Sequence, residues 1–474
     1  MTTIRAGDAT RQALLARKKD VLLEVPGGRR VTGGELETNI QKLAGYLAER
    51  DLAGKRIGLS YRNSIAAFEA FLAVERLGAT RLPTDPDIPA AEAQAMFDAC
   101  PVDAVLADRE HAPGLTDPII HDDTNVLAGS AWTDTPEVEP DSTYMYYPRQ
   151  VASGQLIAVT VSYGNWLATM RINSELFQSG AYGAPFDSDA KLLTMQQLMH
   201  GTSFVASFPF LMMGLPQVIL ARFNAEDALK AIREHQITTT FAVPGMLTRL
   251  ASALDADLGD LPLRHTLYGG APLPLSELRR VIQTLGPSLV QLYGRIEAGW
   301  PLALLGQAEH QIIADGDDQL GSSCGKVIPQ VELRLGPVDN QPEGYGELQT
   351  KNAMTSPAFT DPDGWCALGD IAYQSKSGYL FLHGRLDNMI NSGSYHIYPR
   401  QVEEEIQKDE DVIAVRVRGE SDPKWGQAVV AYVVPKPSAD WDALIERLNT
   451  ELPKSLARYK MPKAYHSCTT LPDS

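Results

Sequence analysis

The sequence is poor in cysteine, and this excludes two classes of protein. Its 474 residues contain four cysteines, Cys100, Cys324, Cys366 and Cys468, which lie far apart. No Cys-x-x-Cys pair and no mixed Cys/His spacing occurs, so neither a zinc site nor a disulfide framework is predicted. Sparse cysteines are typical of the reducing cytoplasm, where we expect this protein to be.

Long apolar runs are lacking too. The most apolar stretch, residues 204–220, is interrupted by serine, proline, glycine and glutamine. A helix that crosses a membrane needs about 20 consecutive apolar residues, so this stretch predicts buried core and no membrane partner. Residues 1–19 show a helical pattern without the apolar core and cleavage site of a signal peptide.

Positive charge is in short supply. The 42 Lys and Arg residues face 59 Asp and Glu residues, which gives a formal net charge of −17. A chain with this charge repels a phosphate backbone, so nucleic-acid binding is excluded as its main role. An anionic ligand must therefore be held locally, by backbone amides or by a few placed cations.

Strand and helix signals alternate along most of the chain, with no internal repeat. Apolar strand candidates are separated by amphipathic helix candidates, and Thr32 and Glu35 have the spacing of a capping box. Alternation of this kind predicts parallel sheets covered by helices. The strand candidates are 21–25, 56–61, 80–83, 104–108, 191–196, 217–221, 238–243, 264–268 and 289–293.

The pattern changes after about Gly344. A hairpin is predicted around Ser377-Gly378, followed by a small α+β unit with helices at 398–408 and 441–452. We therefore predict an α/β fold with a large N-terminal domain, residues 1–386, of layered β-sheets flanked by helices and including a small β subdomain. A small, mobile α+β C-terminal domain is predicted over residues 387–474.

Two motifs follow neighbouring strands of the large domain. The stretch Tyr268-Gly-Gly-Ala-Pro-Leu273 joins a strand to a helix, and its glycines let a flat ligand approach the backbone. The stretch Tyr293-Gly-Arg-Ile-Glu297 puts a carboxylate at the end of the next strand, where it can hold Mg²⁺ opposite substrate phosphates. Each motif by itself is also compatible with an ordinary turn.

Two further motifs lie nearer the C-terminus. Gly364-Trp-Cys-Ala-Leu-Gly-Asp370 ends on a carboxylate that can accept hydrogen bonds from vicinal hydroxyls, such as those of a ribose. The segment 384–403 combines Arg385, a polar hinge, a tight glycine turn and a helix start. Taken alone, the first is compatible with an Asx turn and the second with a solvated linker.

In this order and spacing, the four motifs resemble those of the adenylate-forming superfamily of acyl-CoA synthetases, peptide-synthetase adenylation domains and luciferases. The resemblance covers the chain from about Thr32 to its C-terminus. It implies that a small carboxylic acid reacts with ATP and Mg²⁺ to give an acyl-AMP. It also implies transfer of the acyl group to CoA, a carrier-protein thiol or an amine, with the C-terminal domain rotating between the two steps.

The resemblance also implies roles for single residues. Glu297 would hold Mg²⁺, Asp387 would be the hinge, and Gly393 would border the acceptor channel. His200 would border the acyl site as a second catalytic residue, although the residue type suits a buried structural histidine equally well. The implied nucleotide-binding residues are Ser153, Gly154, Gly269, Gly270, Ala271, Pro272, Tyr293, Gly294, Asp370 and Arg385.

Two stretches depart from the family pattern. The family's phosphate loop is close to T-S-G-T-T-G-x-P-K-G, but residues 149–158 keep only Ser153 and Gly154 of it, with Ile157 at the lysine position. The family's C-terminal lysine would fall a few residues beyond Ser474, so the last domain is expected to be incomplete. Two alternatives follow: a catalytically impaired pseudoenzyme that binds a ligand or partner, and an enzyme that activates an unusual oxyanion such as nitrite.

Candidate residues for an apolar acyl pocket are grouped in one region. They are Met195, Met199, Phe204 and Met212. They favour an aryl or medium-sized apolar acid. Methionine and phenylalanine at such spacing are also common in a plain core, so the acid itself is not identified.

Overall fold

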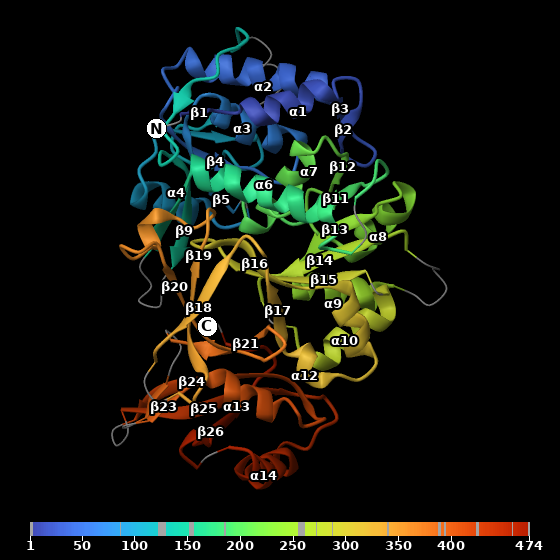
Figure 1. Ribbon diagram of the computed structural model, residues 1–474, viewed down its shortest axis with the longest axis vertical. Helices are drawn as coiled ribbons and strands as arrows, with labels where there is room; N and C mark the ends of the chain where they lie inside the picture. The colour runs from blue at the N-terminus through green and yellow to red at the C-terminus, as the bar shows by residue number, and fades with distance from the viewer. Residues whose placement is uncertain are drawn as a thin grey trace. The chain divides into compact units, whose positions relative to one another are not determined.

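The computed structural model of the protein describes residues 3–85, 87–121, 129–150, 156–183, 186–254, 261–271, 273–286, 288–338, 341–386, 390–392, 395–422, 426–456 and 458–472. The chain forms two compact units (Figure 1). The first unit contains Met1–Glu332 and Thr350–Cys366, and the second contains Leu333–Gln349 and Ala367–Ser474.

The first unit contains a mostly parallel sheet built from the N-terminal third of the chain. Its strands, in spatial order, are β10 (Leu156–Ser162), β9 (Thr143–Gln150), β5 (Thr80–Thr84), β4 (Arg56–Ser60), β6 (Ala104–Ala107) and β7 (Ile119–Ile120). The strands from β9 to β7 pair in parallel, and β10 pairs antiparallel with β9. The crossover helices α3 (Ile65–Arg76) and α4 (Ala90–Ala99) supply the connections that parallel pairing requires.

A second sheet of the first unit holds the middle of the chain. Its strands, in spatial order, are β17 (Ser323–Val327), β16 (Gly299–Leu305), β15 (Leu289–Arg295), β14 (His265–Gly269), β13 (Thr239–Ala242), β11 (Leu192–Thr194), β12 (Gln217–Ile219), β2 (Val21–Glu24) and β3 (Arg30–Thr32). Pairing is parallel from β15 to β2, so these strands end at one common edge.

Helices lie on both sides of this second sheet. In Figure 1, α6 (Tyr163–Ser179) and α7 (Ser207–Met212) lie on one side, and α8 (Ala225–Glu234), α9 (Pro244–Ala253) and α10 (Leu275–Leu285) lie on the other. The remaining elements of the unit are β1 (Ile4–Arg5), α1 (Asp8–Ala16), α2 (Gly33–Ala48), β8 (Glu137–Val138), η1 (Gly201–Phe204), α11 (Gln307–Ala314), α12 (Asp318–Gly321) and η3 (Pro357–Phe359).

Local sequence signals explain where several of these helices begin. Thr32 caps α2, and the Glu35 side chain reaches back to the Thr32 amide at 2.8 Å, so the predicted capping box is confirmed. Ser64 caps α3 by accepting a hydrogen bond from the Ala67 amide. Of the four candidates for an apolar pocket, Phe204 is instead part of the core, and Met212 packs against it.

The second unit has two groups of paired strands. One contains β18 (Glu332–Gly336), β19 (Tyr345–Lys351), β20 (Cys366–Gln374) and β21 (Tyr379–Arg385), with the predicted hairpin joining the last two. The other has the order β23 (Tyr395–Ile397), β22 (Ile390–Ser392), β25 (Gly426–Pro435) and β24 (Val412–Asp422), and β26 (Ala464–Ser467) pairs with β25. The sheet that contains β22 to β26 shares a hydrophobic core of its own with α13 (Pro399–Ile406) and α14 (Trp441–Glu451). Two short helical turns, η4 (Leu452–Lys454) and η5 (Arg458–Lys460), follow α14.

The predicted fold class is confirmed: an α/β chain with a large N-terminal part of layered sheets and a small α+β C-terminal part. The predicted division between residues 386 and 387 stays a prediction, because Asp387 lies outside the described residues. Among the helices that the structure describes, none has the length and apolar character needed to cross a membrane.

A buried ion pair joins α2 to α3, and we expect the fold to depend on it. The Arg76 guanidinium donates two hydrogen bonds to the Glu37 carboxylate, at 2.8 and 3.0 Å, and both side chains are buried. Replacement Glu37→Ala leaves a buried guanidinium without its counter-ion, which should cost about 3–5 kcal/mol of stability. A lowered midpoint of thermal unfolding, followed by circular dichroism, is the expected result.

The matched control is Glu451→Ala. Glu451 pairs with Lys454 at the surface, where an ion pair contributes about 0–1 kcal/mol. Equal midpoints for the two variants would contradict the role given to the Arg76–Glu37 pair.

Candidate functional site

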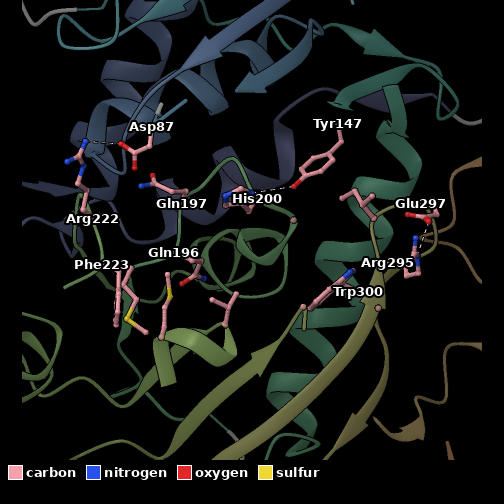
Figure 2. A pocket seen from close by; sticks show the side chains of 17 residues that line it. Asp87, Tyr147, Gln196, Gln197, His200, Arg222, Phe223, Arg295, Glu297 and Trp300 are labelled. Atoms are coloured by element: carbon pink, nitrogen blue, oxygen red, sulfur yellow. Dashed lines mark hydrogen bonds and ion pairs between the residues drawn. The ribbon is translucent and has the colours of Figure 1, made fainter. Parts of the chain in front are cut away.

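A pocket of about 770 Å³ opens at the carboxyl edge of the second sheet of the first unit (Figure 2). Parallel α/β sheets bind ligands at this edge because the loops that leave the strands meet there. The residues that line the pocket are Asp87, Tyr147, Met195, Gln196, Gln197, His200, Gly201, Arg222, Phe223, Val243, Met246, Gly270, Gly294, Arg295, Ile296, Glu297 and Trp300.

The topology of the sheet creates the crevice. In the strand order β14-β13-β11-β12, the chain runs from β11 to its outer neighbour β12 in one direction along the sheet. It runs from β13 to β14 in the opposite direction. The connections after two neighbouring strands therefore diverge, which is the arrangement that opens a ligand site in doubly wound sheets. Gln196 follows β11 and Val243 follows β13, so the two residues come from the two sides of this switch point.

Charged groups occupy opposite sides of the pocket. Figure 2 shows Arg295 and Glu297 on one side and Arg222 and Asp87 on the other. The Arg222 guanidinium donates to the Asp87 carboxylate at 2.8 Å, and Arg62 donates to the same carboxylate oxygen at 2.7 Å. The lining therefore combines two arginines with two carboxylates, and these paired charges suit a polar ligand.

Glu297 lies between β15 and β16 and is largely buried. Its Oε1 accepts a hydrogen bond from the Arg295 Nε at 2.9 Å. The backbone carbonyl of Glu297 accepts from the Ser356 amide at 2.9 Å, and Asn352 donates to the neighbouring Ala298 carbonyl at 3.1 Å. These contacts hold the loop that carries Glu297 in one position.

Glu297 has the chemistry of a Mg²⁺ ligand in a nucleotide site. Mg²⁺ prefers oxygen ligands and is commonly held by one or two carboxylates together with substrate phosphates. The described residues contain no cluster of three or more His, Cys, Asp and Glu side chains that could bind a metal without a substrate. A single carboxylate is compatible with a Mg²⁺ ion whose other ligands come from a substrate, and the metal role of Glu297 stays a prediction.

The glycines of the first two motifs allow an indole ring to pack against the strands. A Cβ atom at Gly294 would lie 2.8 Å from the Trp300 ring, and one at Gly269 would lie 2.2 Å from the Leu292 carbonyl oxygen. Gly270 lines the pocket with φ +89°, a conformation that L-residues rarely adopt. The space that a side chain would take at Gly269 and Gly294 is therefore partly filled by the Trp300 ring.

A buried hydrogen-bond chain supports the strand that ends at Gly269. The Tyr268 hydroxyl lies 2.9 Å from the His310 Nε2, and the His310 Nδ1 lies 2.6 Å from the Gly306 carbonyl oxygen. Burial lowers the pKa of His310 to about 4, so its imidazole is neutral near pH 7. Because a carbonyl oxygen can only accept, Nδ1 carries the proton and Nε2 faces the tyrosine.

His200 lines the pocket and contacts two polar groups. Its Nδ1 lies 3.4 Å from the Tyr147 hydroxyl, and its Nε2 lies 3.8 Å from the Asp85 carboxylate. Burial lowers the pKa of the His200 imidazole, and the Asp85 carboxylate opposes this shift. The neutral imidazole can therefore offer both a donor and an acceptor to a ligand.

Asp370 and Arg385 form an ion pair in the second unit. They lie opposite each other on β20 and β21, and the Arg385 Nη1 donates to the Asp370 Oδ1 at 3.2 Å. The preceding residue, Gly369, has φ +71°, and its amide donates to the Glu347 carboxylate at 3.2 Å. The pairing orients the buried Asp370 carboxylate, and its role toward a ribose stays a prediction.

The other predicted site residues are distributed unevenly. Gly270, Gly294, His200 and Glu297 line the pocket, whereas Gly269, Ala271 and Tyr293 do not. Five predicted residues lie outside the described residues: Ser153, Gly154, Pro272, Asp387 and Gly393.

Sequence reasoning did not single out several residues of the pocket. Arg295 lies inside a recognised motif, so its cationic side chain offered a signal. Arg222 and Asp87 follow strands that were predicted, and polar residues at strand ends are a detectable pattern. Gln196 lies at the end of a predicted strand and shares this signal. Trp300 carries none, because only the packing of neighbouring strands brings it to the pocket.

The fold and the pocket define an α/β protein with a ligand site at a topological switch point. Residues 10–356 match the family model of the AMP-binding enzymes, and residues 401–474 match that of the AMP-binding enzyme C-terminal domain. The first match covers more than half of the chain, so the chain belongs to the AMP-binding enzyme family.

Curated relatives include CoA ligases. The chain is 32% identical over 286 residues to the 2-succinylbenzoate–CoA ligase of Bacillus licheniformis, which covers 58% of this chain and 57% of that ligase. It is 27% identical over 479 residues to the indoleacetate–CoA ligase of Aromatoleum aromaticum, which covers 92% and 91% of the two chains. The chain thus spans less than two thirds of the length of the first of these relatives.

Solved structures share the fold. The amide bond synthetase of Marinactinospora thermotolerans superposes with a TM-score of 0.82 at 24% identity, covering 98% of this chain and 96% of that one. The o-succinylbenzoate CoA synthetase of Bacillus subtilis, in complex with its acyl-adenylate intermediate, superposes with a TM-score of 0.83 at 22% identity, covering 100% and 96%.

The pKa of His200 provides a test of the pocket geometry. We expect the His200 ring to titrate below the ordinary histidine value of about 6.5. Replacement Asp85→Asn should lower this midpoint further, because it removes the carboxylate that favours the imidazolium. Histidine-ring NMR spectra recorded against pH, with the His200 signal assigned through His200→Gln, measure both values.

The control for this titration is Asp98→Asn, which makes the same charge change on the exposed face of α4. It should leave the His200 midpoint in place. A midpoint at or above that of an exposed histidine would show that burial does not lower the pKa of His200.

Proposed function

We propose that this protein catalyses the ATP-dependent adenylation of a small aryl or apolar carboxylic acid and then transfers the acyl group to a nucleophile. The nucleophile is the thiol of CoA or of a carrier protein, or an amine. The observation that carries the proposal is one pocket whose lining includes Gly270, Gly294, Arg295 and Glu297 together with apolar side chains.

The pocket has the parts that adenylation requires. Attack on a phosphate needs charge neutralisation and positioning more than covalent chemistry. Arg295 supplies a cation beside Glu297, and the loop after β14 allows a ligand to approach backbone amides at Gly270. Met195, Phe223 and Met246 supply an apolar lining that suits an aryl or alkyl group.

The proposed reaction has two balanced steps. In the first, a carboxylate oxygen of the substrate attacks the α-phosphorus of ATP, the bond to the β-phosphate oxygen breaks, and pyrophosphate leaves. In the second, the thiol or amine attacks the acyl carbon and loses a proton, the bond from this carbon to the AMP oxygen breaks, and AMP leaves. Mg²⁺, when bound, neutralises the phosphate charge beside Glu297.

Asp370 and Arg385 have a proposed role in binding the ribose of the nucleotide. Asp370 would accept hydrogen bonds from the ribose hydroxyls, with Arg385 holding its carboxylate in place. The support for this role is the ion pair within the second unit and the match to the family motif. Asp387 remains the proposed hinge, and Gly393 the proposed border of the acceptor channel.

Replacement Glu297→Gln tests the catalytic role of the carboxylate. We expect pyrophosphate release to fall by about 100-fold or more, because a positioned charge in the site is lost. Pyrophosphate is followed with a coupled assay over a panel of carboxylic acids, at several Mg²⁺ concentrations. The half-saturating Mg²⁺ concentration for binding of ATP, measured by calorimetry, should rise in the variant.

The matched control is Glu277→Gln. Glu277 pairs with Arg280 on α10, away from the pocket lining, so its replacement should leave turnover unchanged. Normal turnover by the Glu297→Gln variant would refute the metal role.

The same assay separates the alternative functions. A pseudoenzyme would release no pyrophosphate with any acid, and absence of ATP binding as well would refute the proposed function. Release that depends on nitrite, and on no carboxylic acid, would support activation of an unusual oxyanion instead. Addition of CoA, a carrier protein or amines to the active mixture identifies the acceptor.

A further inference from the structure

Gln196 is a buried amide that lacks hydrogen-bond partners. Its side chain is 2% exposed, and neither Nε2 nor Oε1 has a partner among the described residues. Buried polar side chains are normally satisfied, so an amide with two unpaired atoms needs a reason. Gln196 lines the pocket, which provides that reason (Figure 2).

The backbone around Gln196 holds this side chain at the pocket. Asn63 donates to the Gln196 carbonyl at 2.8 Å, and its side-chain oxygen accepts from the Leu198 amide at 2.8 Å. Gln196 is also the second residue after β11, at the switch point where the crevice opens. These two contacts fix the backbone from which the Gln196 side chain extends.

A second buried glutamine shows how such a group is satisfied elsewhere in the same sheet. Gln217 on β12 donates to the Ser207 carbonyl at 2.7 Å and accepts from the Thr194 hydroxyl at 2.8 Å. It is 1% exposed, much like Gln196. The two side chains have the same chemistry and burial, and only the one that faces the pocket lacks partners.

We propose, building on the adenylation function above, that Gln196 selects acids whose apolar body carries a neutral group that both donates and accepts hydrogen bonds, such as a hydroxyl or a carboxamide. Such a group satisfies both ends of the amide, whereas an alkyl, halogen or alkoxy substituent leaves the Gln196 donor, its acceptor or both unpaired. Leaving a buried polar group unpaired is what makes a site reject the analogue that lacks the matching group.

The surroundings of Gln196 favour a neutral substituent. The pocket also contains Met195, Phe223, Val243 and Met246, which cannot solvate a charge. A second carboxylate on the substrate could only accept hydrogen bonds, so it would leave the Gln196 carbonyl oxygen unsatisfied. The positive charge of Arg222 is already paired with the Asp87 carboxylate, on the side of the pocket opposite Glu297.

The test compares wild-type protein with Gln196→Met, a replacement of similar size that removes both polar atoms. The probes are benzoic and phenylacetic acids carrying hydroxyl, carboxamide, methoxy or methyl groups at the 3- or 4-position. We expect the wild type to prefer a hydroxyl or carboxamide acid over its methyl analogue by about 10-fold or more in kcat/KM. The variant should lose this preference, mainly through KM.

Stability provides a readout that a merely structural role would not produce. Gln196→Met should keep or raise the midpoint of thermal unfolding, because it removes an unsatisfied amide. The matched variant Gln217→Met should lower it, because it removes the donor to the Ser207 carbonyl and one of the two partners of the Thr194 hydroxyl. A large loss of stability in Gln196→Met would mean that the amide is satisfied within the protein, and would overturn the inference.

The outcomes also separate this inference from the proposed function. Pyrophosphate release without the expected preference, or a preference that survives Gln196→Met, overturns the role of Gln196 and leaves adenylation standing. If no acid releases pyrophosphate, adenylation of these acids fails, and calorimetric titration of the same acids decides the inference. Binding of a hydroxyl or carboxamide acid that weakens in Gln196→Met supports it, and absence of such binding overturns it.

Discussion

The parallel pairing of β12, β11, β13, β14 and β15 is the constraint on which the site depends. Parallel strands end at one edge, so the residues that follow each strand meet there even though they are far apart in the chain. Gln196, Arg222, Val243, Gly270 and Glu297 come together in this way. A change of strand order would separate them without altering any of the local motifs.

Tight backbone packing and paired charges then give the pocket its walls. The indole of Trp300 packs against the backbone at Gly294 because no side chain is present there. Each carboxylate at the pocket has an arginine beside it, Arg295 for Glu297 and Arg222 for Asp87. In a chain with a net charge of −17, these two arginines balance the two carboxylates that line the pocket.

Local signals predicted most of the fold because they depend on neighbours in sequence. The capping box at Thr32 and the strand that ends before Gly270 follow from residue types and spacing. Glu297 was predicted for a similar reason, since a carboxylate at the end of a strand is visible in the sequence. Gln196 and Trp300 were not, because their importance arises from what lies across the sheet and from what fails to pair with them.

By itself, the sequence determined the alternation of strands and helices, the order of the four motifs and the family to which they point, because these are properties of short segments. The tertiary structure decided which motif residues share a pocket. Gly270 and Glu297 line it while Ala271 and Tyr293 do not, since strand twist and side-chain direction select among neighbours. It also decided the hydrogen-bond state of Gln196, because satisfaction of a buried amide is a property of every group around it.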